Sequence, residues 1–311
     1  MKIAAIQLNA IFADVNANLK KSEEHIRLAV KDGAELVLLP EFFTSAIGFS
    51  DKMLHVAFQN KQVHDTLIRL AKKYHTIIGG SYISFDGNNA YNLFELVFPN
   101  GDNYQHKKDI PTQFEHCYYT SGDENNVFDT PIGNIGIALC WEMIRYDTIK
   151  RLSGKADIVL SGSCWWDLPK DAPKEREPLR QYNQTLALET PANFAKLLNV
   201  PVIHANHCGE VTAWNFPDSD KLQTRQFVGA AQIINHQGAI IARRCFNEGD
   251  GFVISDIEWN KGNYKTAVTF SQGYWIPDLP DSYINAWETM NPKGQEYYKN
   301  VALTYYKGGI V

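Results

Sequence analysis

Two chemically reactive side chains of this sequence come directly after apolar segments that are typical of buried strands. Cys140 follows the run IGIAL, and Glu41 follows LVLLP. In layered α/β folds, side chains at the carboxyl ends of strands are held rigidly and still reach the ligand crevice. A cysteine there can attack an electrophilic carbon, and a nearby glutamate can remove the thiol proton. The sequence therefore predicts Cys140 as a nucleophile and Glu41 as its general base.

Attack on a carbonyl or nitrile carbon also needs a positive group that stabilises the developing negative charge. The segment HKKDIPTQFEH offers Lys107 and Lys108 as candidates. Backbone N–H groups just after Cys140 are a second source, because the chain is expected to enter a helix there. Each residue also has an ordinary interpretation, since free cysteines are commonly buried hydrophobes and adjacent lysines are commonly solvated. Only their combination favours catalysis.

The segments that must position these residues predict one layered α/β domain, because helices alternate with buried strands early in the chain and hairpins follow later. Helices are expected at 17–34, 63–75, 146–156 and 176–199, and Pro191 should kink or divide the last of them. Strands are expected at 2–9, 35–40, 76–84, 91–98, 157–163, 200–207, 227–235, 239–244 and 251–257, with two more within 126–140. Residues 107–125 are expected to form a loop region.

Three motifs in this chain resemble those of the nitrilase superfamily of carbon-nitrogen hydrolases, which carries a Glu-Lys-Cys triad in this chain order. The first is an apolar strand that ends in Pro-Glu, and the third is a strand that ends in Cys, an aromatic and an acidic residue. The residues that match the three motifs are Leu39, Pro40, Glu41 and Phe42, then Tyr104, Lys107, Glu115, Gly122 and Asp123, and finally Cys140, Trp141 and Glu142. Asp109 departs from the second motif, which often has His at this position. The resemblance covers roughly the first 255 residues.

The resemblance implies a role for each triad position. Glu41 would be the general base and Cys140 the nucleophile, while Lys107 would stabilise the tetrahedral intermediate together with the backbone N–H of Trp141. We choose Lys107 over its neighbour because Lys107 keeps the family's two-residue step to the next polar position. Glu115 would be an accessory carboxylate that positions the substrate or the lysine.

Trp165 and Trp166 follow the strand expected at 157–163. The family places the corresponding segment at the wall of the substrate pocket, so we expect these two residues, with Trp141, to line that pocket. A core or interface position is the alternative for either tryptophan. His204 and His207 lack matching carboxylates or cysteines, so a structural role is favoured over a metal site.

By resemblance, the fold would be a four-layer αββα sandwich formed by residues 1–260. The extension at 261–311 is rich in Tyr, Trp and Pro, and we expect it to pack on the domain or on a partner subunit of a homodimer or larger homo-oligomer. The leading functional hypothesis is an amidase that releases ammonia or an amine from a small amide through a thioester, without a metal or organic cofactor. A nitrilase and a catalytically silent binding protein of the same fold are the alternatives.

Composition excludes several other classes. The 30 Lys and Arg against 35 Asp and Glu give a net charge of −5, which argues against binding to nucleic acid backbones. The first residues do not resemble a signal peptide, and no segment has the ~20 apolar residues of a membrane span, so a cytoplasmic protein is expected. Five cysteines without a CxxC pair suggest neither a disulfide framework nor a zinc ribbon.

Overall fold

The computed structural model describes residues 1–122, 127–214, 221–259 and 273–308. Its helices are α1 Val15–Lys31, α2 Lys52–Gln59, α3 Val63–Tyr74, α4 Tyr146–Leu152, α5 Glu177–Leu198, α6 Asp281–Tyr297 and α7 Leu303–Gly308. Its strands are β1 Lys2–Leu8, β2 Leu36–Leu38, β3 Ile77–Phe85, β4 Ala90–Val97, β5 Asn103–Lys107, β6 Phe128–Thr130, β7 Gly133–Ile137, β8 Ile158–Ser163, β9 Trp166–Pro169, β10 Val202–His207, β11 Glu210–Trp214, β12 Leu222–Phe227, β13 Gly229–Ile234, β14 Ile240–Cys245 and β15 Gly251–Asp256. Two short 3-10 helices matter for the site, η2 Gln113–Cys117 and η3 Cys140–Ile144.

The main strands form two half-sheets. The first runs in the order β5-β4-β3-β2-β1 and continues into β15, which pairs antiparallel with β1. The second runs β6-β7-β8-β10 and continues through β13 into β14. The half-sheets are joined where the carboxyl ends of β1 and β10 pair in parallel, at Gln7 with Asn206 and Leu8 with His207. Strands β9, β11 and β12 form a separate small sheet.

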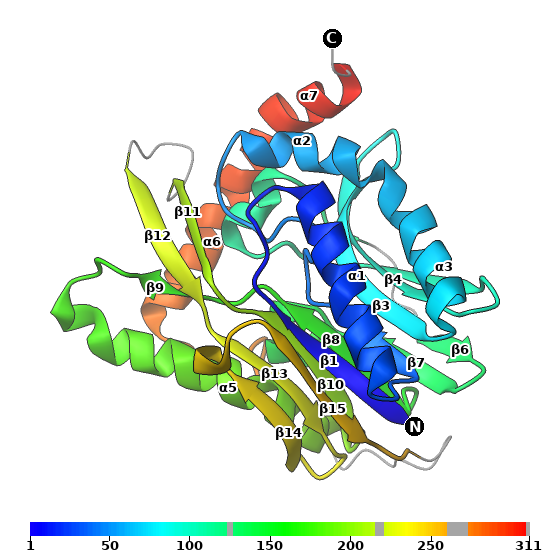
Figure 1. Ribbon diagram of the computed structural model, residues 1–311. Coiled ribbons are helices and arrows are strands. Elements are labelled where there is room, and N and C mark those ends of the chain that lie inside the picture. Colours follow the sequence, from blue (N-terminus) through cyan, green and yellow to red (C-terminus); the bar gives the residue numbers. More distant parts are fainter. Residues whose placement is uncertain (123–126, 215–220, 260–272, 309–311) are drawn as a thin grey trace.

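Figure 1 shows α1 and α3 on one side of the sheets and α5 on the other. The side chains of each strand alternate between two of these layers. On β1, Ala4 and Ile6 belong to the hydrophobic cluster that includes α1 and α3, while Ile3 and Ala5 belong to the cluster between the half-sheets. Helices α4 and α5 cover the outer face of the second half-sheet, in a third cluster that includes Val159 and Val202. Central strands that are apolar on both faces can therefore pack on a helix layer and on the other sheet at once, which gives the predicted order of helix, sheet, sheet, helix.

Helix α5 is not divided at Pro191, which was one of the two predicted effects of this residue, but runs continuously from Glu177 to Leu198. Proline in a helix interior removes one backbone hydrogen bond and costs about 3 kcal/mol. Phe194 and Leu198, on the turns after the proline, are buried against the second half-sheet. Tertiary packing of these residues offsets the local cost.

The C-terminal segment returns to the domain after residues 260–272, which lie outside the described part of the chain. Helix α6 packs on η2, and the approach is so close that a Cβ on Gly294 would lie 2.6 Å from the Cβ of His116. Division of the chain at residue 260 and contact with a partner subunit remain predictions. No helix in the described ranges combines the length and apolar character that a membrane crossing requires.

Candidate active site

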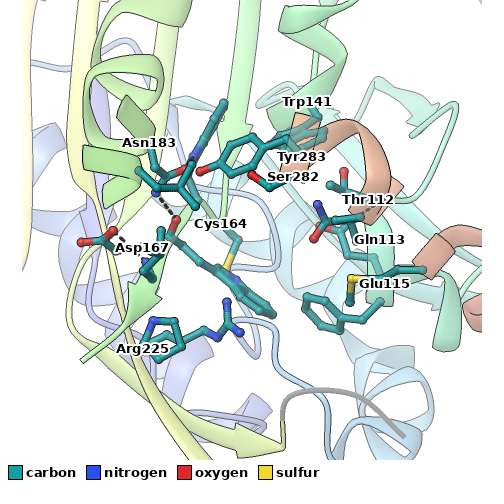
Figure 2. Close-up of a pocket in the computed structure, with 18 of the residues that line it drawn as sticks. Thr112, Gln113, Glu115, Trp141, Cys164, Asp167, Asn183, Arg225, Ser282 and Tyr283 are labelled. Atoms are coloured by element: carbon teal, nitrogen blue, oxygen red, sulfur yellow. Dashed lines mark hydrogen bonds between the residues drawn. The ribbon is translucent and has the colours of Figure 1, made fainter. Parts of the chain in front are cut away.

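A pocket of about 320 Å³ opens beside the carboxyl ends of the central strands, between α6 and the small sheet (Figure 2). Four segments of the chain form its walls. They are η2, the start of η3, the segment from Cys164 through β9, and α6, together with side chains from α5 and β12. Cys140, Glu115, Trp141, Trp165 and Trp166 all line this pocket. Five of the residues singled out in the sequence are thus brought to one place.

Glu41 lies three residues after the end of β2 and is fully buried. Its Oε1 accepts hydrogen bonds from Asn92 Nδ2 at 2.8 Å and from Lys108 Nζ at 2.9 Å, and its Oε2 accepts one from the backbone N–H of Cys164 at 3.0 Å. Gly162 on β8 allows the two half-sheets to meet here, because a Cβ on Gly162 would lie 2.6 Å from the Glu41 nitrogen. The carboxylate is therefore fixed from both half-sheets.

Lys108, and not Lys107, is the lysine of this network, so the sequence-based choice of Lys107 is wrong. The Lys108 ammonium is fully buried, 2.9 Å from Glu41 Oε1 and 2.8 Å from Glu115 Oε2. The Lys107 ammonium instead lies over the ring of Tyr91, 4.2 Å from its centroid. Successive side chains of a strand point to opposite faces. His106 and Lys108 share the buried face of β5 and its extension, and Lys107 has the other face.

Glu115 holds Lys108 from the side opposite Glu41. Its Oε2 accepts hydrogen bonds from Lys108 Nζ, from the backbone N–H of Thr112 at 3.0 Å and from the hydroxyl of Tyr119. Since η2 begins directly after Thr112, the carboxylate also caps that short helix. The accessory carboxylate therefore orients the ammonium and is itself held in place by the backbone.

Cys140 has a backbone conformation that is uncommon for a residue with a side chain. Its φ is +48°, in the left-handed region. Cys140 is the first residue of η3, at the point where the short segment after β7 enters this helix. Non-glycine residues in this region cost of order 1–3 kcal/mol and cluster at functional sites. The thiol is hydrogen-bonded to Ser163, whose Oγ lies 2.9 Å from Nε2 of the buried His204. A polar chain therefore supports the thiol from the second half-sheet.

Burial and nearby charges favour the protonated form of the Cys140 thiol and bring the pKa of the Glu41 carboxyl group close to neutral pH. Burial raises the pKa of Glu41 to about 7, although the attraction of Lys108 partly offsets this effect. Burial also raises the pKa of the Cys140 thiol well above its ordinary value, and the Glu41 carboxylate acts in the same direction. Burial alone would lower the pKa of Lys108, but attraction to Glu115 and Glu41 outweighs it and keeps the ammonium charged. The site thus combines a neutral thiol, a fixed cation and a carboxyl group that titrates near neutral pH.

The buried carboxylate of Glu142 connects the segment that leads into Cys140 with the segment that follows Lys108. Its Oε2 accepts from the backbone N–H of Leu139 at 2.6 Å, and its Oε1 accepts from the backbone N–H of Asp109 at 3.0 Å. His106 Nε2 lies 3.2 Å from the same carboxylate. Leu139 directly precedes Cys140, and Asp109 directly follows Lys108. This one buried side chain therefore fixes the Cys140 and Lys108 segments relative to each other.

The C-terminal segment forms part of the pocket wall, which sequence reasoning missed. Trp141 stacks on Trp287, with the ring centroids 5.8 Å apart and the planes inclined by 11°, and also on Tyr283. Ser282, Ala286 and Met290 of α6 line the pocket as well. The abundance of aromatics after residue 273 was the available signal.

Asn92, Ser163 and His204 were also missed as members of the site. Asn92 and Ser163 are buried polar residues inside β4 and β8, where a strand pattern predicts only core packing. A buried polar residue is normally hydrogen-bonded, so its presence in an apolar strand is itself a signal. Within the described residues, no group of three or more His, Cys, Asp or Glu side chains is placed to hold a metal ion.

Comparison with known proteins gives matches of three kinds. Residues 2–261 match the profile of the family described as "Carbon-nitrogen hydrolase". The chain is 29% identical to nitrilase 1 of Arabidopsis thaliana over 164 residues, 46% of this chain and 47% of the relative. It is 30% identical to a citrullinase of Francisella tularensis over 155 residues, 46% of this chain and 53% of the relative. The chain thus spans about half the length of the curated relatives it matches.

Solved structures share the fold at low identity. An amidase of Nesterenkonia sp. AN1 superposes with a TM-score of 0.66 at 18% identity, covering 83% of this chain and 92% of that one. A carbon-nitrogen hydrolase from Helicobacter pylori G27 superposes with a TM-score of 0.71 at 16% identity, covering 82% of this chain and 88% of that one. The four-layer arrangement is therefore common to all three proteins.

Proposed function

This chain belongs to the carbon-nitrogen hydrolase family, and we propose that it hydrolyses the carbon-nitrogen bond of a small amide through a thioester on Cys140. The observation that carries the proposal is the position of Cys140. Its thiol lies at a pocket wall in a left-handed backbone conformation, where the charges of Glu41, Lys108 and Glu115 all act on it. A buried bystander cysteine needs no such surroundings.

In the first half of the reaction, the Cys140 sulfur forms a bond to the amide carbon as its proton passes to Glu41. Because the pKa of the thiol is raised, proton removal has to accompany attack, and a carboxylate with a pKa near 7 is suited to this role. The carbonyl π electrons move to oxygen, where the Lys108 ammonium and the backbone N–H of Trp141 stabilise the negative charge. The carbon-nitrogen bond then breaks, and the leaving amine takes the proton from Glu41.

In the second half, water hydrolyses the thioester. Glu41, now a carboxylate again, removes a proton from the attacking water as the oxygen-carbon bond forms. The tetrahedral intermediate collapses, the sulfur-carbon bond breaks, and the proton on Glu41 returns to the sulfur of Cys140. The products are a carboxylic acid and ammonia or an amine. Glu115 takes no proton in this scheme but keeps Lys108 directed at the reacting oxygen.

A nitrilase is the second candidate, because the nitrilases of Arabidopsis are among the most similar curated relatives. A nitrile carbon would be attacked by the same thiol, and two waters in place of one would be consumed before ammonia and acid are released. The amide is preferred here because the amidase of Nesterenkonia shares the fold over most of both chains, and a mutant of that amidase carries acrylamide added to its active-site cysteine.

Matched pairs of small amides and nitriles test this choice. The full chain is incubated with each member of a pair, such as butanamide and butanenitrile, and released ammonia is measured. Release from the amides supports the proposal, and release from nitriles alone would establish the second candidate.

A catalytically silent protein of the same fold is tested with an iodoacetamide probe followed by mass spectrometry of the labelled cysteines. If Glu41 activates the thiol, Cys140 should be labelled in the wild-type protein and labelled more slowly in Glu41→Gln. An unlabelled Cys140 beside labelled Cys245, which is exposed, would instead favour a binding protein.

A further inference from the structure

We propose that His204 and Ser163 keep the resting nucleophile protonated, because His204 takes the proton of the Ser163 hydroxyl and Ser163 accepts a hydrogen bond from the Cys140 thiol. The inference rests on the proposed role of Cys140 and describes the site before substrate binds. Ser163 ends β8, His204 lies on the neighbouring strand β10, and both side chains are fully buried. The Ser163 hydroxyl contacts both partners, since it is hydrogen-bonded to the thiol and lies 2.9 Å from His204 Nε2.

The backbone of Ala230 determines which ring nitrogen of His204 carries a proton. The carbonyl oxygen of Ala230 lies 3.2 Å from His204 Nδ1. Ala230 has a φ of +67°, and the pairing of β13 with β14 shifts between Gly229 and Ala231. Such a β-bulge redirects groups of the chain and is common next to active sites. Because a carbonyl oxygen only accepts hydrogen bonds, Nδ1 is the nitrogen that carries the proton.

The other nitrogen of His204 is a hydrogen-bond acceptor, because the ring is neutral. Burial lowers the pKa of His204 to about 4, although the hydrogen bond to Ala230 acts in the opposite direction. A neutral imidazole that is protonated on Nδ1 has a lone pair on Nε2. The Ser163 hydroxyl therefore donates its proton to Nε2.

The direction of the Ser163 proton decides what this hydroxyl can offer to Cys140. With its proton on the side of His204, the oxygen presents only lone pairs to the sulfur, so it accepts from the S–H group. Acceptance from S–H stabilises the neutral thiol, whereas donation to the sulfur would stabilise the thiolate. The thiolate is the form that reacts with electrophiles and oxidants. The thiol thus stays protected until a substrate is bound and Glu41 removes its proton.

The same contacts do not make His204 a second general base. A proton that moved from Cys140 through Ser163 would leave a group with a pKa well above 9.0 and reach one with a pKa of about 4. This transfer is unfavourable by more than about 10⁵-fold. Glu41, with a pKa of about 7, is the better acceptor. Ser163 and His204 are therefore positioning residues, which act on the reaction through the thiol.

The tautomer of His204 is tested in the wild-type protein. NMR of the ring nitrogens in isotope-labelled protein distinguishes a proton on Nδ1 from a proton on Nε2. The signals of His204 are identified by their absence from His204→Gln. We expect a neutral ring that is protonated on Nδ1 at neutral pH. A ring protonated on Nε2, or on both nitrogens, would overturn the inference, because the Ser163 hydroxyl could then donate to the sulfur.

Two variants of His204 test the effect on the thiol. Alkylation of Cys140 by iodoacetamide is followed by mass spectrometry at one pH, with the exposed Cys245 as an internal reference. His204→Leu removes the acceptor, so the Ser163 hydroxyl can donate to the sulfur. We expect alkylation to become about 5- to 10-fold faster, which is the effect of one hydrogen bond. His204→Gln should restore a rate close to wild type, because its amide oxygen can accept the Ser163 proton.

The double variant Ser163→Ala/His204→Leu separates this effect from looser packing. Without a hydroxyl to donate to the sulfur, the acceleration should disappear, and the rate should match that of Ser163→Ala. Acceleration that persists in the double variant, or that is absent from His204→Leu, would overturn the inference. Neither measurement needs turnover, so both stand even if the wild-type protein releases no ammonia from any amide or nitrile, a result that would overturn the proposed function alone.

Discussion

Glu41 and Glu142 are both fully buried, yet their surroundings shift their pKa values in opposite directions. Burial raises the pKa of Glu41 to about 7, because its one ammonium partner, Lys108, is shared with Glu115. Burial opposes ionisation of Glu142 as well, but His106, Arg151 and Arg145 outweigh it and hold its pKa well below the ordinary value. Two backbone N–H groups add to that effect. Equal burial therefore produces one carboxyl group that can exchange a proton and one that stays ionised.

The two carboxyl groups bind neighbouring residues, Glu41 the Lys108 ammonium and Glu142 the backbone N–H of Asp109. Glu41 belongs to the network in which the single Lys108 ammonium is shared by two carboxylates. Glu142 instead has His106, Arg151 and Arg145 around it and accepts hydrogen bonds from two backbone N–H groups. The balance of partners, more than burial, decides which role a buried glutamate has in this fold.

Glu41→Gln should give the largest loss. The amide cannot take the thiol proton, so we expect kcat for amide hydrolysis to fall by about 10³-fold or more, measured as ammonia release. The unfolding free energy should change little or rise near neutral pH, because a destabilised buried carboxylate is removed. If Glu41→Gln keeps its activity, another residue must act as the general base.

Glu142→Gln should instead lower stability. Loss of one partner leaves the cations around it buried and uncompensated, which costs about 3 kcal/mol in the free energy of unfolding. Urea denaturation measures this. Residual activity at low temperature, where the variant is folded, should stay well above that of Glu41→Gln. Unchanged stability with lost turnover would make Glu142 a participant in the reaction.

The neighbouring lysines provide a matched pair. Lys108→Gln removes the cation between Glu41 and Glu115, and we expect kcat/KM to fall by about 100-fold or more as the charge on the oxyanion loses its partner. Lys107→Gln removes the same charge one residue away and should stay within about threefold of wild type, since its ammonium lies over Tyr91. Equal losses from both would show that bulk charge, and not position, matters.

The pH dependence is a smaller effect but tests the comparison directly. The base must be ionised before attack, so kcat/KM should rise about tenfold per pH unit and level off above a pKa of about 7. The contribution of Glu41 to the free energy of unfolding should instead fall as pH rises. The raised pKa of Glu41 gives a contribution that is full below the unfolded value of 4.5 and lost as pH rises through about 7.

Glu142 has the opposite sign in the same titration. Its lowered pKa gives stability that is present above 4.5 and lost as pH falls through the folded value. Chemical denaturation from below pH 4.5 to above pH 7, in wild type and both glutamine variants, should therefore show the slope between 4.5 and about 7 disappear in Glu41→Gln and the slope below 4.5 disappear in Glu142→Gln. A wild-type profile that is flat between pH 4.5 and 7 would contradict the raised pKa of Glu41.

Sequence reasoning identified the layered fold and both strand-end residues, because continuous apolar runs that are typical of buried strands end just before Glu41 and Cys140. It placed the lysine one residue too early, because Lys107 was chosen for its two-residue step to the next polar position. Recognition of β5 would have put His106 and Lys108 on one face. Arg225, which lines the pocket, was not identified from the sequence, because the polar strand β12 has no apolar alternation that would reveal it as a strand. The position of β12 beside the pocket depends on its pairing with β9 and β11.

The close packing of α6 on η2 has an evolutionary consequence. Substitutions at Ser282, Tyr283, Ala286 or Met290 change the pocket wall, whereas substitutions at Asn291 or Gly294 would move η2, the segment that carries Glu115. Selection can therefore vary the first turns of α6 and alter which molecules fit the pocket, while the later turns that contact η2 have to be kept. Divergence of pocket shape in such proteins would then be concentrated in the first turns of α6.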